Sequence, residues 1–386
     1  MSQNHFDLTE EQLRQRTGTK WNHFPNDVLP LWVADMDFRI AEPIRAAIRE
    51  YADCDDFGYP LGSGIPGLLD AVAGHLERNH GVSYAPEQIY PASGINPNLY
   101  LGIQALSGPG DEVVLQPPIY PPFRMAVEST GRKVLENPMQ QLNGRWELDF
   151  GQLEQAITPA TRVLVLCNPQ NPTGRVFTRD ELSRLAEIAL RHNLWVISDE
   201  LHSDLVLSGK HIPFATISDE IAQRTITLFG PTKTFNIAGL KIGFAMSHNQ
   251  QLLDRLKQQA SGLLTPPNVL AQAAARAAFN ECADWHARTL DYLRSNCKLL
   301  SELVASELPG VKYTPGEGTY LAWPDFRDVI APEELDAFLL EQAKVAVNSG
   351  ASFGTGGSGF VRLNLATSAE IIREAVGRIS RALAAR

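Results

Sequence analysis

The chain is 386 residues long, which is enough for two domains, or for one large and one small domain, with a sizeable buried core. Hydrophobic residues make up 44% and charged residues 20%, so the composition is typical of a folded globular protein. The formal net charge of −10 argues against a nucleic-acid surface and against attachment to anionic lipid. We therefore expect neither nucleic acid nor a membrane as a partner.

The first residues lack the pattern of a targeting segment. Met1–Glu10 is polar and acidic, which predicts no signal peptide. Apolar segments such as Leu299–Leu308 are short and are interrupted by serine and glutamate, so no membrane-spanning helix is expected. These features favour a cytoplasmic protein.

The cysteines lie far apart in the sequence, at Cys54, Cys167, Cys282 and Cys297. No pair has the spacing of metal ligands, and no zinc-like spacing occurs elsewhere. The sequence therefore predicts reduced, buried thiols and no metal site.

Short apolar runs alternate with longer helical patterns through the middle of the chain. The predicted strands are Glu112–Gln116, Arg162–Cys167, Leu194–Ser198, Thr225–Phe229 and Gly243–Ser247. The predicted helices between them are Ile95–Leu106, Arg179–His192 and Asn249–Gly262. Such alternation predicts a mainly parallel sheet with helices on both faces, and ligands bind such sheets outside the carboxyl ends of the strands.

After Pro267 the pattern changes to that of a smaller α+β unit. Helices are predicted at Asn268–Asn280, Ala283–Glu307, Pro332–Gln342 and Ser368–Leu383, and strands at Thr319–Trp323, Lys344–Asn348 and Phe360–Leu365. The long helix that starts near residue 283 is expected to connect the two parts. Gly350–Gly359 is rich in Gly, Ser and Thr, and is either a mobile flap over a site or a plain surface loop.

Polar residues follow several of the predicted strands. The loop Asn168–Gly174 follows one strand, Asp199 ends the next, and Lys233 comes shortly after a third. A lysine between threonines is by itself a weak signal, because most such lysines are solvated surface residues. A polar loop, an acid and a lysine in this order on successive strands are, however, the parts of a pyridoxal-phosphate site, in which the lysine holds the aldehyde as a Schiff base.

The same residues belong to a longer set of motifs that also occurs, in the same order, in a known family of proteins. The motifs are Arg16–Trp21, Leu31–Phe38, Phe57–Tyr59, Gln116–Phe123, Ser198–Asp204 and Lys233–Leu240. In this order the chain resembles the pyridoxal-phosphate enzymes of the aspartate aminotransferase fold, and within them the MalY/PatB group of cystathionine β-lyase-like C–S lyases. The motifs run from the N-terminal arm to Arg362 and so cover nearly the whole chain.

The resemblance implies an α/β fold of type I, with a mainly parallel seven-stranded sheet in a large domain and a smaller α+β domain. We expect an N-terminal arm with part of the small domain in residues 1–45. The large cofactor-binding domain is expected in residues 46–283 and the small C-terminal domain in residues 284–386.

The resemblance also assigns residues to the cofactor ring. Lys233 is expected to bind pyridoxal 5′-phosphate covalently and then, once freed, to take the substrate's Cα proton. Asp199 should keep the pyridine nitrogen protonated, although a strand-end acid is otherwise often a helix cap. Tyr120 should stack on the ring, Asn171 should bind its phenolic oxygen, and His202 is either near that oxygen or a packed histidine. For Tyr120 the alternative is a plain turn residue among prolines.

Other residues match the family's phosphate and substrate contacts. Backbone amides at Gly94 and Ile95, the Thr232 hydroxyl and the Lys241 amine are expected near the phosphate, with the role of Lys241 left open. Tyr59 should reach the phosphate of the neighbouring subunit, which implies a homodimer. For the substrate, Arg362 should grip the α-carboxylate, with Asn171 and the backbone near Ala34 completing that pocket.

The implied reaction is β-elimination from cystathionine or a related cysteine S-conjugate, giving thiol, pyruvate and ammonia. An aminotransferase needs the same lysine, acid and arginine, and only the subgroup motifs favour elimination. A lyase for a larger conjugate remains an alternative, as does a regulator that acts through contact with a transcription factor, which some members of the group do.

Overall fold

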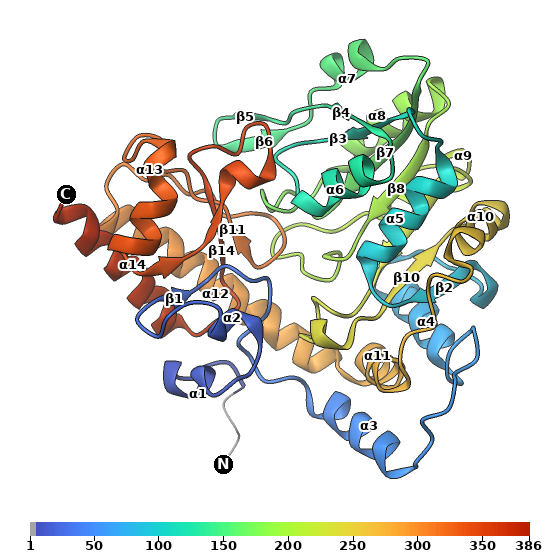
Figure 1. The fold of residues 1–386 in the computed structure, drawn as a ribbon, viewed down its shortest axis with the longest axis horizontal. Coiled ribbons are helices and arrows are strands. Elements are labelled where there is room, and N and C mark those ends of the chain that lie inside the picture. Colours follow the sequence, from blue (N-terminus) through green and yellow to red (C-terminus); the bar gives the residue numbers. More distant parts are fainter. Residues whose placement is uncertain (1–4) are drawn as a thin grey trace.

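A mixed sheet of seven strands forms the centre of the larger part of the protein, whose computed structural model describes residues 5–386 (Figure 1). Its strands are β2 (Ile89–Ala92), β3 (Glu112–Leu115), β4 (Lys133–Glu136), β7 (Thr161–Cys167), β8 (Trp195–Asp199), β9 (Thr225–Phe229) and β10 (Gly243–Met246). They lie in the order β2-β10-β9-β8-β7-β3-β4. Strand β10 is antiparallel to both of its neighbours, and the other four pairings are parallel. The predicted mainly parallel seven-stranded sheet is confirmed.

The central strands are apolar on both faces because helices cover both sides of the sheet. In β7, Val163 and Val165 belong to one apolar core, whereas Leu164 and Leu166 belong to another. All four side chains are fully buried. Continuous apolar runs of this kind are what a doubly covered parallel sheet requires.

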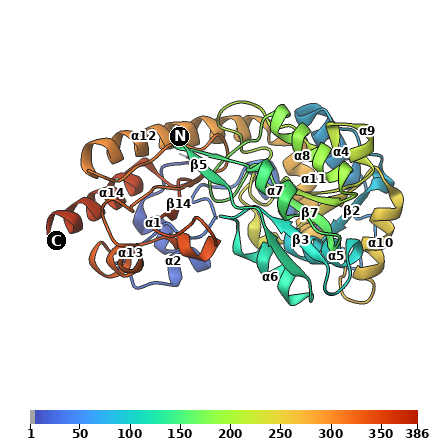
Figure 2. The same ribbon diagram turned by 90° about the horizontal axis from the view of Figure 1, so that it is seen from above.

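The helices of the larger part form two layers around the sheet (Figure 2). They are α3 (Glu42–Asp53), α4 (Leu68–His80), α5 (Ile95–Leu106), α6 (Pro121–Ser129), α7 (Phe150–Ala156), α8 (Arg179–Arg191), α9 (Asp219–Ala222), α10 (Gln250–Ala260) and α11 (Val269–Glu281). Helices α5, α6 and α10 share one core with the sheet, and α7, α8 and α9 share the core on the other face. Short elements complete this part: η1 (Pro86–Gln88), β5 (Gln140–Leu142), β6 (Arg145–Glu147), η2 (Phe214–Thr216) and η3 (Ala238–Leu240).

Strands β2 and β4, at the two edges of the sheet, were not predicted from the apolar pattern. Strand β2 contains Pro91, which cannot donate a ladder hydrogen bond and is tolerated at an edge. In β4 none of the side chains is fully buried, so the strand lacks an apolar run. Edge strands carry less of the burial signal that identifies central strands.

The smaller part is built around two short sheets and a long helix. Its elements are α12 (Ala283–Glu307), β11 (Leu321–Ala322), α13 (Pro332–Ala337), η4 (Phe338–Gln342), β12 (Val345–Ala346), β13 (Asn348–Ser349), η5 (Gly350–Phe353), β14 (Val361–Asn364) and α14 (Ala369–Ala384). Strand β14 lies between β11 and β13 and is antiparallel to both. Helix α12 runs along one side of the molecule from the smaller part toward α11 of the larger part, and it packs on α14 (Figures 1 and 2).

The N-terminal segment packs with this smaller part. It contains α1 (Glu10–Arg14), α2 (Thr19–Asn22) and β1 (Leu29–Pro30), and β1 pairs in parallel with β12. Leu13 and Trp21 share an apolar core with Leu300 of α12 and Ile372 of α14. This packing supports an N-terminal arm that joins the small unit. The domain limits at residues 45 and 283 stay a prediction, and the first four residues of the arm lie outside the described residues.

Several local expectations differ from the structure. The predicted strand Lys344–Asn348 is divided, since β12 pairs with β1 while β13 pairs with β14. The predicted helix Pro332–Gln342 changes after Ala337 into the wider π-turn η4. The expectation that all thiols are buried is wrong for Cys54, which is exposed at the C-terminal end of α3. Within residues 5–386, no helix is long and apolar enough to cross a membrane.

Candidate active site

A cavity of about 570 Å³ opens at the carboxyl ends of β7 and β8, between the sheet and the smaller part of the protein. Eleven of the residues singled out in the sequence line it: Ala34, Gly94, Ile95, Tyr120, Asn171, Asp199, His202, Thr232, Lys233, Lys241 and Arg362. They come from segments up to 328 positions apart, from Ala34 to Arg362. The predicted position at the strand ends is therefore confirmed.

Lys233 extends into the cavity from the loop that follows β9. Its ammonium group donates a hydrogen bond of 2.8 Å to the backbone oxygen of Ala34. Burial lowers the pKa of Lys233; Asp35 opposes the shift, and Arg362 adds to it. A lowered pKa favours the neutral amine that a Schiff base requires.

Asn236 fixes this loop against the N-terminal segment. Its side chain donates to the backbone oxygens of Met36 and Phe38, each at 3.0 Å, and accepts from the Met36 N–H at 3.1 Å. The loop that carries the lysine is thereby joined to the segment that carries Ala34. The position of the Lys233 amine therefore depends on the loop and on the N-terminal segment.

Asp199 ends β8 and is buried at the cavity wall. Burial raises the pKa of Asp199 to about 7; the hydrogen bond from the Leu201 N–H, 3.0 Å long, opposes the shift, and Glu200 adds to it. A cationic partner in the cavity would stabilise the charged form of this carboxyl, because burial without a cation destabilises that form. A protonated pyridine nitrogen fits that requirement.

Another part of the cavity wall has the features of a phosphate site. Ser93 and Gly94 precede α5, whose first residues Ile95 and Asn96 also line the cavity, so N–H groups of a helix N-terminus lie at its wall. The Gly94 N–H itself donates to the Ala92 backbone oxygen at 2.8 Å. Gly94 has a φ of 112°, which residues with side chains rarely adopt, and a Cβ on Gly243 would lie 3.0 Å from the Gly94 carbonyl carbon. Thr232 and Lys241 line the same cavity. These residues fit a phosphate group, whereas the specific role of Lys241 stays a prediction.

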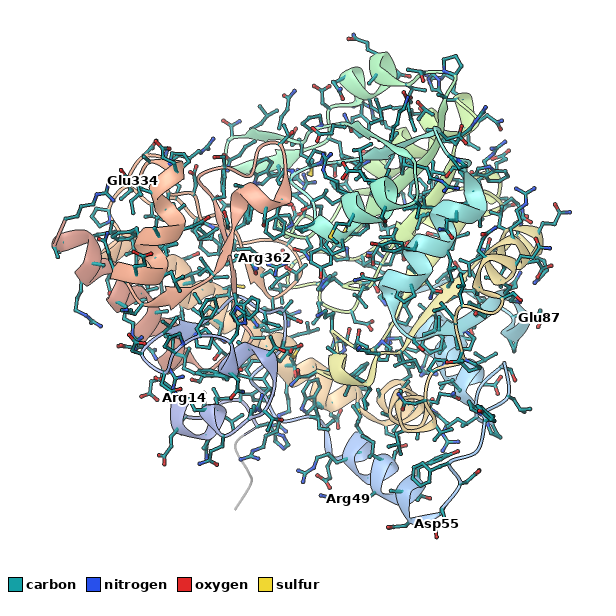
Figure 3. The ribbon with its side chains drawn as sticks, viewed as in Figure 1. Arg14, Arg49, Asp55, Glu87, Glu334 and Arg362 are labelled. Atoms are coloured by element: carbon teal, nitrogen blue, oxygen red, sulfur yellow. The ribbon has the colours of Figure 1, made fainter. Side chains whose placement is uncertain are left out.

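Arg362, on β14, is a buried cation near the centre of the molecule (Figure 3). Its guanidinium donates to Asn348 Oδ1 at 2.7 Å, to Asn171 Oδ1 at 3.1 Å and to the Trp32 backbone oxygen at 3.3 Å.

All three of these acceptors are uncharged, and the arginine Nε has no partner among the described residues. Burial lowers the pKa of Arg362 to about 10, which leaves it charged at neutral pH. A buried cation with neutral partners and a free donor is well suited to bind a carboxylate.

Aromatic rings surround this cation. The guanidinium carbon lies 5.1 Å from the ring centre of Phe353 and 6.0 Å from that of Tyr120. Phe353 is buried at the end of η5, in the first half of the Gly350–Gly359 loop, and its backbone oxygen accepts from the Ile119 N–H at 2.8 Å. The loop is thus anchored beside the site at this end, and its action as a flap stays a prediction.

His202 is buried in the cavity wall, 6.1 Å from the ring centre of Tyr320. Burial lowers the pKa of His202 to about 3, and the charges of Lys233 and Arg362 contribute in the same direction. The imidazole is therefore neutral at physiological pH. Both expectations for His202 describe part of the geometry, because the ring is packed and also lines the cavity.

Tyr59 is the one predicted site residue that lies away from the cavity of its own chain. Its side chain is fully exposed in the segment that follows α3, beside the exposed side chains of Phe57 and Leu61. This position is compatible with a contact to a second subunit, and the contact itself stays a prediction.

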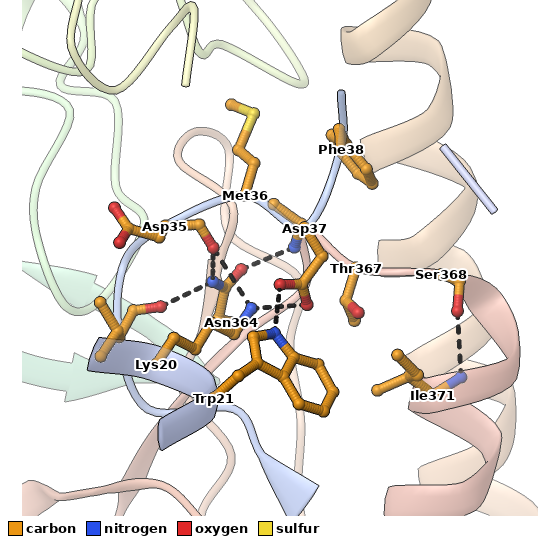
Figure 4. A network of polar contacts seen from close by, with 12 residues as sticks. Lys20, Trp21, Asp35, Met36, Asp37, Phe38, Asn364, Thr367, Ser368 and Ile371 are labelled. Atoms are coloured by element: carbon orange, nitrogen blue, oxygen red, sulfur yellow. Dashed lines mark hydrogen bonds and ion pairs between the residues drawn. The ribbon is translucent and has the colours of Figure 1, made fainter. Parts of the chain in front are cut away.

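A polar network that the sequence did not reveal holds the wall of the cavity in place (Figure 4). Asp37 is buried and accepts from Lys20 Nζ and Trp21 Nε1, each at 2.7 Å. Asn364 donates to the backbone oxygens of Val33 at 2.7 Å and Asp35 at 2.6 Å, on either side of Ala34.

The network joins two motifs of the resemblance, because Lys20 and Trp21 of one motif donate to Asp37 of the other. Asn364 stands two positions after Arg362, so both side chains project from the same face of β14. The two-residue spacing from Arg362 is the one feature of the sequence that could have pointed to Asn364. Tyr320 was also missed, and its hydroxyl donates to the Ala34 backbone oxygen at 2.8 Å.

Comparison with known proteins identifies the family to which the chain belongs. Residues 26–379 match the class I and II aminotransferases. Cystathionine beta-lyase PatB of Bacillus subtilis (strain 168) is 38% identical over 393 residues, which cover 98% of this chain and 99% of PatB. Cystalysin of Treponema denticola, whose structure contains pyridoxal 5′-phosphate, has a TM-score of 0.94 at 29% identity, with 99% of each chain covered.

A pyridoxal-phosphate-bound C–S lyase of Staphylococcus hominis has a TM-score of 0.92 at 27% identity, with 99% of this chain and 98% of that chain covered. The chain therefore belongs to the family of class I and II aminotransferases. Within that family, the likeness to PatB confirms the resemblance to the MalY/PatB-like C–S lyases.

Proposed function

We propose that the protein is a pyridoxal-phosphate-dependent C–S β-lyase that cleaves cystathionine or a related cysteine S-conjugate to thiol, pyruvate and ammonia. One observation carries the proposal: Lys233, Asp199 and Arg362 line a single cavity. The three side chains supply an amine, an acid and a carboxylate receptor, which are the groups that such a reaction requires. The names of the relatives favour elimination over the other reactions of the family.

The cofactor would be held at three places. Lys233 would bind its aldehyde, Asp199 would face its ring nitrogen, and the Ile95 N–H, beside the backbone of Gly94, would bind its phosphate together with Thr232. Tyr120 is half-buried at the cavity wall, where its ring can cover one face of the heterocycle. When bound, pyridoxal phosphate supplies the electron sink that makes the substrate's Cα–H bond acidic.

Arg362 would set the orientation of the substrate. A guanidinium binds a carboxylate through two parallel hydrogen bonds, which fixes the direction of the Cα–H bond relative to Lys233. The neutral side chains of Asn171 and Asn348 hold the guanidinium without neutralising it. Its charge is thus available to the substrate.

Lys233 would then act as the base. Its amine, close to the Ala34 backbone oxygen and with a pKa lowered by burial, can accept the Cα proton once it is free of the cofactor. Loss of that proton and of the sulfur substituent from Cβ leads, after hydrolysis, to pyruvate and ammonia. Neutral His202 adds no positive charge that would compete for the carboxylate.

We further propose a homodimer in which Tyr59 of each chain reaches the phosphate site of the other. The segment around Tyr59 exposes three large apolar side chains, Phe57, Tyr59 and Leu61. Exposed apolar groups that are adjacent in the chain are typical of a protein–protein contact. A phenol hydroxyl is suited to donate a hydrogen bond to phosphate.

Incubation of the cofactor-loaded enzyme with L-cystathionine and with S-alkyl cysteines, without any keto acid, tests the proposed activity. Pyruvate and thiol should form in equal amounts over many turnovers. If product forms only when a keto acid is added, the enzyme is an aminotransferase, the alternative that the family also contains. The side chains that are cleaved fastest then define the substrate.

A further inference from the structure

A second cluster of potential ligands lies behind the active-site loop. His75 and His80, from the C-terminal half of α4, meet Asp204, which follows β8 by five residues. His75 Nε2 lies 3.0 Å from each carboxylate oxygen of Asp204, and His80 Nε2 lies 2.8 Å from Oδ1. All three side chains are at least nine-tenths buried.

We propose that His75, His80 and Asp204 form a binding site for one divalent transition-metal ion, with Zn²⁺ as the best match. Two imidazole nitrogens and one carboxylate oxygen are a ligand set that zinc sites use, with water as the fourth ligand. A buried carboxylate is also stabilised by a cation placed against it. The spacing rules applied to the sequence could not find this set, because Asp204 is separated from His80 by more than 120 positions.

The spacing of the ligand atoms can be compared with that of a zinc centre. A tetrahedral zinc centre with bonds of about 2.0–2.1 Å separates its ligand atoms by about 3.3 Å. The three nitrogen–oxygen separations are 3.0, 3.0 and 2.8 Å, and all the ligand atoms lie within 4.8 Å of one another. The nitrogen–oxygen pairs would therefore open by a few tenths of an ångström, and rotation of the histidine side chains would set the two imidazole nitrogens, now within 4.8 Å of each other, to about 3.3 Å.

Asn79, one turn further along α4, contacts the ring of His75. Its side-chain nitrogen lies 3.0 Å from His75 Nδ1 and 3.2 Å from His75 Nε2, so the amide lies over the imidazole ring. A histidine that binds metal through Nε2 donates its Nδ1–H to a neighbouring oxygen. For Asn79 to accept from Nδ1–H, its amide oxygen would have to take the place of the nitrogen and move into the plane of the ring.

The ion would join three elements near the active site. Asp204 also accepts a hydrogen bond of 2.6 Å at its backbone oxygen from His286 Nε2 of α12. The site would therefore connect α4 and α12 with the segment that carries Asp199 and His202. Its role is to fix that segment, so the ion touches neither cofactor nor substrate.

Metal affinity tests the inference separately from lyase activity. The cofactor-loaded enzyme, with Cys54→Ser to remove the exposed thiol, is stripped with a chelator. It is then titrated with Zn²⁺ against a chromogenic chelator, and Co²⁺ absorbance reports the coordination geometry. One ion should bind per chain. Asn79→Ala should weaken binding by about tenfold, and His75→Gln should weaken it further.

His192→Gln, at the end of α8, is the matched control and should leave the affinity unchanged. The cofactor absorbance of each variant checks that it has folded. If His75→Gln does not fold, Asn79→Ala provides the comparison. Absence of stoichiometric binding, or equal affinity in Asn79→Ala, His75→Gln and the control, would overturn the inference.

Discussion

Replacing Arg362 by alanine should reduce the kcat/KM for the substrate far more than it reduces the stability of the fold. The guanidinium is buried, and its partners Asn171, Asn348 and Trp32 contribute only neutral oxygens. The substrate carboxylate would therefore be its one anionic partner. Loss of a buried, hydrogen-bonded charge pair costs about 2–4 kcal/mol. This corresponds to a rise of about 30- to 1000-fold in the substrate concentration needed.

The assay is steady-state pyruvate formation from L-cystathionine, with kcat/KM as the readout. Arg362→Lys should fall between the parent and Arg362→Ala, because an ammonium retains the charge but lacks the paired donors. Arg294→Ala, at a partly exposed position of α12, serves as the control and should be neutral. A normal kcat/KM in folded, cofactor-loaded Arg362→Ala would refute the role of the guanidinium.

Two further predictions concern Asp199 and the proposed dimer. Burial raises the pKa of Asp199 to about 7 from an ordinary value of 3.8, so the cofactor-free protein should lose stability as the pH rises through this interval. Asp199→Asn removes that loss, and its Tm relative to the cofactor-free parent should therefore increase from about pH 4 to about pH 8. A pH-independent Tm difference would contradict a buried, uncompensated carboxyl. In the second experiment, inactive Lys233→Ala protein is mixed with weakly active Tyr59→Ala protein under conditions that exchange subunits. One site of each hybrid would then contain both native residues, and activity should rise above that of either variant alone. No rise, with subunit exchange verified, would exclude a site shared between chains.

The parts of the fold that could be predicted are those with a strong burial signal. Helix α5 has the predicted bounds Ile95–Leu106, and β9 has the predicted bounds Thr225–Phe229. All five residues of β9 are buried, and apolar residues predominate in α5. The edge strands β2 and β4 were missed because Pro91 and partial exposure weaken that pattern. Edge position is a property of the assembled sheet and not of the segment.

In the candidate site, too, the sequence predicts some features and misses those that depend on the folded chain. Motif order was sufficient to select Lys233, Asp199 and Arg362, which the structure places in one cavity. The acceptor of the lysine, the backbone oxygen of Ala34, lies 199 positions away and carries no side-chain signal. The hydrogen bonds of Asn364 to backbone oxygens beside Ala34 are equally invisible in the sequence. Contacts to backbone atoms across long separations become visible only once the chain is folded.

Reduction of the cofactor-loaded enzyme with borohydride, followed by peptide mass spectrometry, tests the central claim most directly. Borohydride converts a lysine-bound pyridoxal into a stable secondary amine that marks its residue. The pyridoxyl group should be found on Lys233, and Lys233→Ala should lose both the mark and the yellow absorbance. A mark on another lysine, or a colourless protein after reconstitution with pyridoxal phosphate, would contradict the account.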